Sequence, residues 1–251
     1  MPYFSLYLFL ASSFSAAVCK PKHDIPLNLK GSMTRKQVNT VLSLVSIPEN
    51  GDTKWWKHYN FIQNIHDGRG FTVSIVGFCT GTGDFIQVLQ NLQQINPSHT
   101  LVKYVDTVKD KTGDDTSGLE GLEDDVKKIG NEDHQFNKAV WNVIQTLYWD
   151  PAIDFCDKRG MKSALAKYIV YDTLLNIGSL DAFQNIPGKD EKEKISSFLD
   201  IKHNQLQSGK FGSSDDSQNR VGMQKKLLSD GNFDLKTPMH VQCYGEEFDL
   251  K

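Results

Sequence analysis

Two carboxylates in the first third of this chain have the side-chain types and the spacing to act as an acid–base pair. Glu49 lies in the stretch I-P-E-N-G, and Asp67 lies in the glycine turn D-G-R-G, 67 − 49 = 18 positions later. Cleavage of a glycosidic bond needs one carboxylic acid to protonate the leaving oxygen and one carboxylate to activate water or attack carbon. A glutamate after an apolar helix and an aspartate in a glycine turn have different environments, which is how enzymes separate an acid from a base. The spacing alone is weak evidence, because a chain with 31 acidic residues contains many such pairs.

The elements around the pair must hold the two carboxylates apart. Residues 33–45 carry apolar side chains at helical spacing behind Thr34, a candidate N-cap. The proline and the asparagine–glycine pair of I-P-E-N-G should end that helix. Residues 55–65 repeat the helical spacing, so we expect a second helix between Glu49 and Asp67. Such a helix would set its two flanking loops on opposite sides of a cleft.

Downstream of Asp67 the pattern changes to a strand and then to more helices. Residues 71–78 alternate and are rich in β-branched side chains, which predicts one strand. Asp84 is a good N-cap for a helix that extends to Leu92. Apolar spacing predicts four further helices, at 136–148, 161–175, 195–206 and 221–228. The helix at 161–175 is apolar enough to be buried. A polar loop is expected at 211–219. We therefore expect a mainly helical chain with one small sheet.

Length and composition exclude several classes of protein. The 251 residues are 39% hydrophobic and 24% charged, which is enough for a real core in one domain of two lobes or in two small domains. A formal net charge of -3 gives no sign of a nucleic-acid interface. The acidic segment 106–133 is best explained as a solvated loop and helix face, and an acidic wall for a cationic ligand is its functional alternative.

The first 17 residues have the pattern of a secretory signal peptide. An apolar stretch from Tyr3 to about Leu10 passes into small residues, and we expect cleavage near Ala17. Because no lysine or arginine precedes Lys20, an N-terminal anchor or a lipid on Cys19 are the alternatives. The rest of the chain lacks the run of about 18 apolar residues that would predict a membrane span.

Four cysteines are spread along the chain, at Cys19, Cys79, Cys156 and Cys243. Their wide spacing argues against a zinc site of the C-x-x-C type. In an oxidising compartment one or two disulfides are plausible, and three pairings are open to four cysteines. The sequence does not choose among these pairings.

The sequence motifs around the carboxylate pair form a longer pattern: E-N…W-K-x-x-Y…I-x-D-G-R-G-F-T-V-x-I-V-G-F…G-T-G-D. This pattern resembles the chitosanases of glycoside hydrolase family 46. The resemblance extends in order over about residues 33–250, through the following segments: Y-W-D-P-A at 148–152, Y-I-V-Y-D at 168–172, F-L-D at 198–200 and G-N-F-D-L at 231–235. The combination of D-G-R-G-F-T with G-T-G-D is specific.

The resemblance implies a mainly α, lysozyme-like (α+β) fold, with two helical lobes, a small β-sheet and a substrate cleft between the lobes. It implies that residues 18–251 form one secreted, monomeric catalytic domain that cleaves β-1,4 bonds inside chitosan, without a metal or organic cofactor. Glu49 would be the general acid and Asp67 the general base of an inverting reaction, with Thr72 holding the attacking water. The resemblance also assigns Arg69 and Asp84 to substrate binding, and Asp150, Arg220 and Lys202 to an ionic network behind the acid. Trp55 is a further substrate-binding candidate, because aromatic faces suit sugar rings, although Trp55 and Trp56 are more often core residues.

Three departures from the family pattern bear on substrate binding and on the network. Gln63 and Asn64 stand where family members often have acidic residues. Lys202 stands where we expect arginine, and lysine cannot form the bidentate fork of a guanidinium. The segment between Ile177 and Lys194 looks shorter than usual, so one wall of the cleft should differ.

Rival interpretations remain open at this level. A lysozyme-like enzyme acting on acetylated wall polysaccharide would share the fold, a catalytically weakened protein would bind chitosan without shortening it, and an acidic interaction protein would do neither. Gly81 and Gly83 are not followed by the G-K-[ST] of a phosphate loop. A thiol nucleophile formed by Cys79 with His66 would need an exposed thiolate, and a cysteine buried near a strand is the simpler state.

Overall fold

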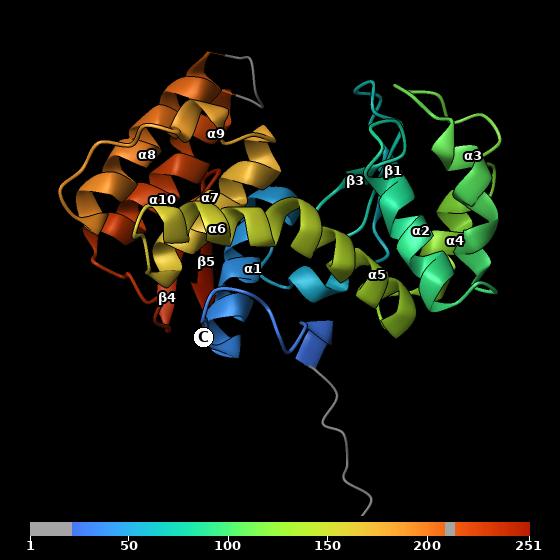
Figure 1. Ribbon diagram of the computed structural model, residues 1–251, viewed down its shortest axis with the longest axis horizontal. Helices are drawn as coiled ribbons and strands as arrows, with labels where there is room; N and C mark the ends of the chain where they lie inside the picture. Colours follow the sequence, from blue (N-terminus) through green and yellow to red (C-terminus); the bar gives the residue numbers. More distant parts are fainter. Residues whose placement is uncertain (1–21, 209–213) are drawn as a thin grey trace, which may run out of the picture.

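Two lobes share one long helical connection in the computed structural model, which describes residues 22–208 and 214–251 (Figure 1). The connection consists of α5 (His134–Ile144), the π-helical turn η4 (Gln145–Trp149) and α6 (Asp150–Lys158). The expected signal peptide and Cys19 lie outside the described residues. Within those residues, no helix is long and apolar enough to cross a membrane.

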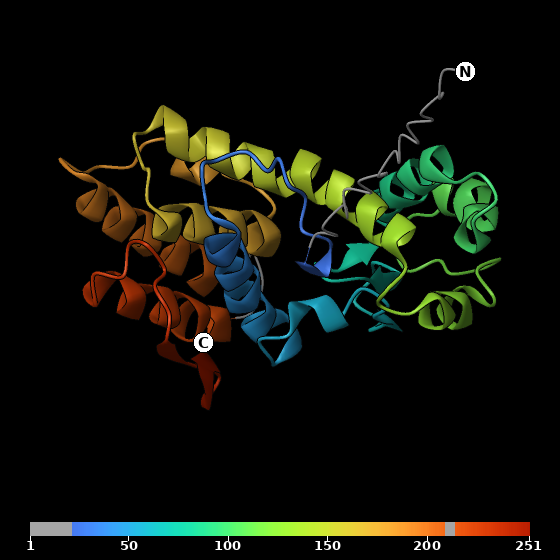
Figure 2. The ribbon, with the colours of Figure 1, turned by 90° about the horizontal axis from the view of Figure 1, so that it is seen from below.

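The larger lobe is built around a buried helix, α7 (Ala164–Ile177). Ser163 caps this helix, and its side chains are buried nearly all round, as an apolar core helix requires. The elements packed about it are α1 (Arg35–Asn50), η5 (Asp181–Phe183), α8 (Glu191–Gln207), α9 (Ser214–Gln218), α10 (Arg220–Ser229), and the antiparallel hairpin of β4 (Met239–Cys243) and β5 (Glu246–Leu250). Figure 2 shows α1 beside the C-terminal helices of this lobe.

The smaller lobe carries a three-stranded antiparallel sheet in the order β1-β2-β3. Its register pairs Gln63 with Thr72 and Thr72 with Cys79. The strands and helices of this lobe, with the two short turns that precede them, are η1 (Lys22–Asp24), η2 (Trp55–Lys57), β1 (Ile62–Asn64), β2 (Phe71–Val73), β3 (Phe78–Cys79), α2 (Phe85–Ile95), η3 (Thr100–Tyr104), α3 (Val105–Lys109) and α4 (Leu122–Ile129). The hydrophobic core continues through both lobes.

The first helix confirms its predicted start and corrects its predicted end. Thr34 accepts a hydrogen bond from the Gln37 backbone in a capping box. The helix does not stop before Pro48 but continues to Asn50, because a proline in the last turn removes only one backbone hydrogen bond. Gly51, at φ 71°, ends the helix in the left-handed conformation. Glu49 therefore lies in the last helical turn rather than in a loop.

Other predicted elements change type. Residues 55–65 do not form the predicted long helix but only the short η2 followed by β1, because the pairing of β1 with β2 overrides the apolar spacing. The single strand predicted at 71–78 is two short strands joined by a turn in which Gly77 has a positive φ of 72°. The C-terminal hairpin was not predicted, and the predicted loop at 211–219 contains α9. The helices predicted from 136 to 228 and the helix capped by Asp84 are confirmed, with shifted ends.

Cys79, Cys156 and Cys243 are buried and carry free thiols. No disulfide therefore joins any two of these three residues. Burial raises the pKa of the Cys156 thiol to about 12 and that of the Cys243 thiol to about 11. Neither thiol is a nucleophile at neutral pH.

Candidate active site

Glu49 lies at the end of α1 with one third of its side chain exposed (33%). Its Oε1 accepts a hydrogen bond from Nη2 of Arg220, which begins α10 and is only 3% exposed. The two residues are 171 positions apart, so the contact depends on the packing of α10 beside α1. A carboxyl group in this position is held from behind and open on its other side.

Behind Arg220 lies a second carboxylate, Asp172 of α7, which is completely buried. The Oδ1 atom of Asp172 lies 3.6 Å from Nε of Arg220, and its Oδ2 lies 2.5 Å from Nζ of Lys202 on α8. The charges therefore alternate from the surface inward, as Glu49, Arg220, Asp172 and Lys202. We call these four residues the acid network.

The charges of the acid network shift the pKa values of its buried members. Burial opposes the charge on Asp172, but the charges of Arg220 and Lys202 outweigh it, so the pKa of Asp172 lies below its usual value. Burial also opposes the charge on Arg220, and Asp172 and Glu49 together raise the pKa of its guanidinium. Burial lowers the pKa of Lys202, and the adjacent Asp172 partly offsets this.

The sequence assigned Arg220, Lys202 and Asp150 to this network, and the structure brings together only the first two. Among the described residues, no ion pair joins Asp150 to Arg220, and Oδ1 of Asp150 is buried without a hydrogen-bond partner at the start of α6. Asp172 occupies the central position instead. The one carboxylate in a mostly apolar and mostly buried helix was the signal in the sequence that could have identified it.

Asp67 lies on the other lobe, in the loop between β1 and β2. Nε and Nη2 of Arg69 donate to its Oδ2 at 2.8 Å and 2.5 Å, and the Arg69 backbone N–H donates to its Oδ1 at 3.2 Å. These hydrogen bonds, which exceed the effect of partial burial, lower the pKa of Asp67. Asp67 therefore stays ionised to lower pH than an isolated aspartate.

The loop that carries Asp67 is held by close backbone packing. A Cβ on Gly81 would lie 1.8 Å from the carbonyl oxygen of Gly113, so only glycine allows the two segments to approach. Asp114 accepts a hydrogen bond from the Gly70 backbone at 3.2 Å, and its second oxygen lies 3.7 Å from Nδ1 of His66. Part of the acidic segment 106–133 thus supports the candidate base.

Thr72 lies in the small sheet, on β2, and Asp84 lies between β3 and α2. The hydroxyl of Thr72 lies 3.7 Å from the thiol of Cys79, on the strand paired with β2. Oδ1 of Asp84 accepts hydrogen bonds at 2.8 Å from three donors, which are the backbone N–H groups of Cys79 and Phe85 and the hydroxyl of Thr82. Asp84 is therefore an N-cap that also closes the turn before α2.

Trp55 does not present its ring at the surface. It is 2% exposed, its Nε1 donates to Oδ1 of Asn39 at 3.2 Å, and its ring packs edge-on against Trp141. The position belongs to the core between the lobes, so we do not retain Trp55 among the substrate-binding residues. Within residues 22–208 and 214–251, no cluster of three or more His, Cys, Asp or Glu side chains is arranged to hold a metal ion.

Comparison with known proteins agrees with the mainly helical fold. A family model for glycosyl hydrolase family 46 matches residues 43–239. The chain belongs to this family.

The relatives of this chain have a common name. The chitosanase of Bacillus subtilis strain 168 is 30% identical over 233 residues, which cover 84% of this chain and 83% of that protein. The crystal structure of a native chitosanase from Bacillus subtilis MY002 superimposes with a TM-score of 0.77 at 29% identity, covering 87% of this chain and all of that one. A complex of a Gynuella sunshinyii family 46 chitosanase with chitotetraose superimposes with a TM-score of 0.76 at 25% identity, covering 87% and 99% of the two chains.

Proposed function

We propose that this protein is a chitosanase that cleaves β-1,4 bonds between glucosamine units inside chitosan chains, by an inverting mechanism. The observation that carries the proposal is the pair of differently supported carboxylates on the two lobes, Glu49 and Asp67, in a chain of family 46. The relatives named chitosanase and the structural neighbour bound to chitotetraose support chitosan as the substrate.

Glu49 is the proposed general acid. Its helical position and its contact with Arg220 hold the carboxyl in one orientation, and its exposed edge is free to face the glycosidic oxygen. Proton donation to the leaving oxygen requires the protonated form, so activity should fall at high pH.

Asp67 is the proposed general base. Arg69 binds mainly Oδ2, which leaves Oδ1 to accept a proton from a water molecule. Because Arg69 lowers the pKa of Asp67, the base form persists into mildly acidic solution, where the amines of chitosan are protonated. Thr72, on the strand that follows this loop, would help to hold the attacking water, which would reach the sugar from the face opposite Glu49.

Carboxylates near Asp67 account for recognition of a cationic polymer. Asp84 directs Oδ1 to three donors of its own turn, and its negative charge would attract a glucosamine ammonium group. We expect Arg69 to contact the sugar as well. We expect the enzyme to be a monomer. We also expect it to act outside the cell, on the chitosan polymer.

The test is reducing-end release from soluble, fully deacetylated chitosan by the wild type, Glu49→Gln and Asp67→Asn. Each isosteric variant should lower kcat by about 10³-fold or more, because each removes one proton transfer. NMR of the first product should show the anomer opposite to the substrate linkage. Cleavage of chitin or peptidoglycan in preference to chitosan would indicate the lysozyme-like alternative, and retention on a chitosan column without cleavage would indicate a binding protein.

A further inference from the structure

Gln224 is a buried glutamine that contacts two members of the acid network. It lies on α10, one helical turn after Arg220, and has 0% exposure. Its Nε2 donates to Oδ2 of Asp172 at 2.7 Å, and its Oε1 lies 3.2 Å from Nζ of Lys202. The amide therefore bridges the buried cation and the buried anion.

This bridge supplies the second hydrogen-bond donor that a lysine alone does not offer to Asp172. A guanidinium presents two parallel N–H donors to a carboxylate, whereas an ammonium is a point charge. Lys202 and Gln224 together supply two donors, and both of them bind Oδ2 of Asp172. Oδ1 is left facing Nε of Arg220 at 3.6 Å, and neither of these two atoms has a hydrogen-bond partner.

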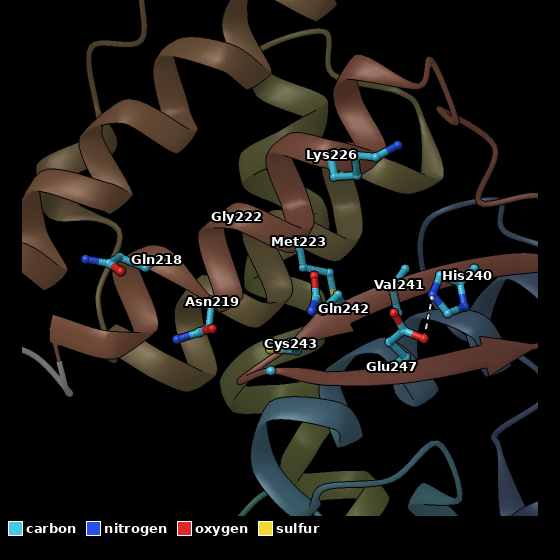
Figure 3. A pocket seen from close by; sticks show the side chains of 11 residues that line it. Gln218, Asn219, Gly222, Met223, Lys226, His240, Val241, Gln242, Cys243 and Glu247 are labelled. Atoms are coloured by element: carbon cyan, nitrogen blue, oxygen red, sulfur yellow. Dashed lines mark ion pairs between the residues drawn. The ribbon is translucent and has the colours of Figure 1, made fainter.

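Asp172, Lys202 and Gln224 are each completely buried. A cavity of about 680 Å³ separates α10 from the hairpin of β4 and β5, and Figure 3 shows the side chains that line it. The side chains of Met223 and Cys243, which face this cavity, are 3% and 2% exposed, and Gln224 is not among the lining residues. A hydrogen bond between completely buried groups is stronger than one at the surface.

We propose that Gln224 is a positioning residue for the general acid, which it serves by satisfying Oδ2 of Asp172 so that Arg220 remains available to Glu49. The proposal rests on the proposed function of Glu49. Without the amide, Asp172 has one donor fewer and draws the Arg220 guanidinium toward itself. Glu49 then has less of the positive charge beside it, and the alkaline limb of the pH profile of activity should move to higher pH.

The charged and titratable groups that act on this arrangement come from the larger lobe and from the helical connection. Besides Glu49, these groups are Arg220 on α10, Asp172, Tyr168 and Tyr171 on α7, Lys202 on α8, Asp216 on α9, Tyr148 on η4 and Cys243 on β4. None of them is altered by replacing Gln224. The effect on Glu49 is therefore attributable to the lost hydrogen bonds.

The experiment compares pH profiles of kcat/KM for chitosan hydrolysis by the wild type, Gln224→Ala and the double variant Lys202→Arg/Gln224→Ala. In Gln224→Ala the alkaline limb should move to higher pH by about one unit. The rate at the optimum should fall by about tenfold, with little change in KM. In the double variant, arginine occupies the space of the amide and supplies two donors to Asp172, so the limb should return toward its wild-type position.

Thr173→Val is the matched control, because Thr173 is also completely buried and lies beside Asp172, while its hydroxyl donates to the Ile169 carbonyl outside the network. It should lower the melting temperature without moving the limb. The proposal would be overturned if a folded Gln224→Ala variant kept the wild-type position of the alkaline limb. It would also be overturned if the alkaline limb had the same position in Gln224→Ala and in Lys202→Arg/Gln224→Ala. A wild type that does not cleave chitosan would instead refute the proposed function.

Discussion

The two proposed catalytic carboxylates are held in contrasting ways. Glu49 is attached to residues distant in sequence, through Arg220 to Asp172 and Lys202 in the interior of the larger lobe. Asp67 is held by Arg69, two positions away, in a loop exposed to solvent. A buried chain of charges fixes position but depends on every member, whereas a local hydrogen-bonded turn depends on few residues and tunes basicity.

Arg220→Met should have the largest effect, because it disrupts the buried network that supports Glu49. It leaves Asp172 facing an apolar side chain, and loss of one partner from a buried ion pair costs about 3–5 kcal/mol of unfolding free energy. We expect kcat to fall by about 10³-fold, since Glu49 also loses its support. Urea unfolding and chitosan hydrolysis measure the two effects.

Lys225→Met provides the control, because Lys225 is on the same helix but pairs with Asp200 in an exposed position. Its removal should change neither quantity measurably. Equal losses from Lys225→Met and Arg220→Met would mean that the buried network has no special part in the activity.

Arg69→Met should have an intermediate effect, because it changes the exposed loop that holds Asp67. Arg69 lowers the pKa of Asp67, so the base form is present above that lowered pKa and is lost as the pH falls through it. Without Arg69 the pKa of Asp67 rises, and the acid limb of kcat/KM should move to higher pH by about one unit. The free energy of unfolding should hardly change, because the ion pair of Arg69 with Asp67 is largely exposed.

Lys111→Met removes a nearby cation that pairs with Asp115 and not with Asp67, so it should leave the acid limb in place. An acid limb that is the same in Arg69→Met and in the wild type would show that Asp67 is not the group that limits the rate at low pH.

Asp84→Asn should have the smallest effect and sharpen the distinction between structural and substrate-binding carboxylates. The amide oxygen can still accept the hydrogen bonds from Cys79, Thr82 and Phe85, so the fold should persist. Only the charge is lost, and KM for deacetylated chitosan should rise by about fivefold with kcat nearly unchanged. Steady-state kinetics at low and high salt would check this, since the difference from wild type should shrink at high salt.

Asp133→Asn is the corresponding control, because Asp133 caps α5 in the same manner through Gln135 and Phe136. An equal rise of KM in this variant would assign the effect of Asp84→Asn to helix capping instead of substrate binding.

Local physical chemistry was enough to predict much of this protein. Caps such as Thr34 and Asp84 were found from the sequence because a cap depends on a side chain and a backbone within three residues. The loop of Asp67 and Arg69 was also found, because its contacts join neighbours in the chain. The buried helix α7 was predicted from its apolar composition alone.

Only the tertiary structure decided which distant residues meet. Pairing of β1 with β2 replaced a predicted helix, and Trp55 became a core residue because its ring is enclosed between the lobes. Asp172 and Gln224, not Asp150, join Lys202 and Arg220, since the register between α7, α8 and α10 sets which side chains face one another. The sequence by itself determined the types of chemical groups and their local supports, whereas long-range contacts depend on helix packing that no local pattern specifies.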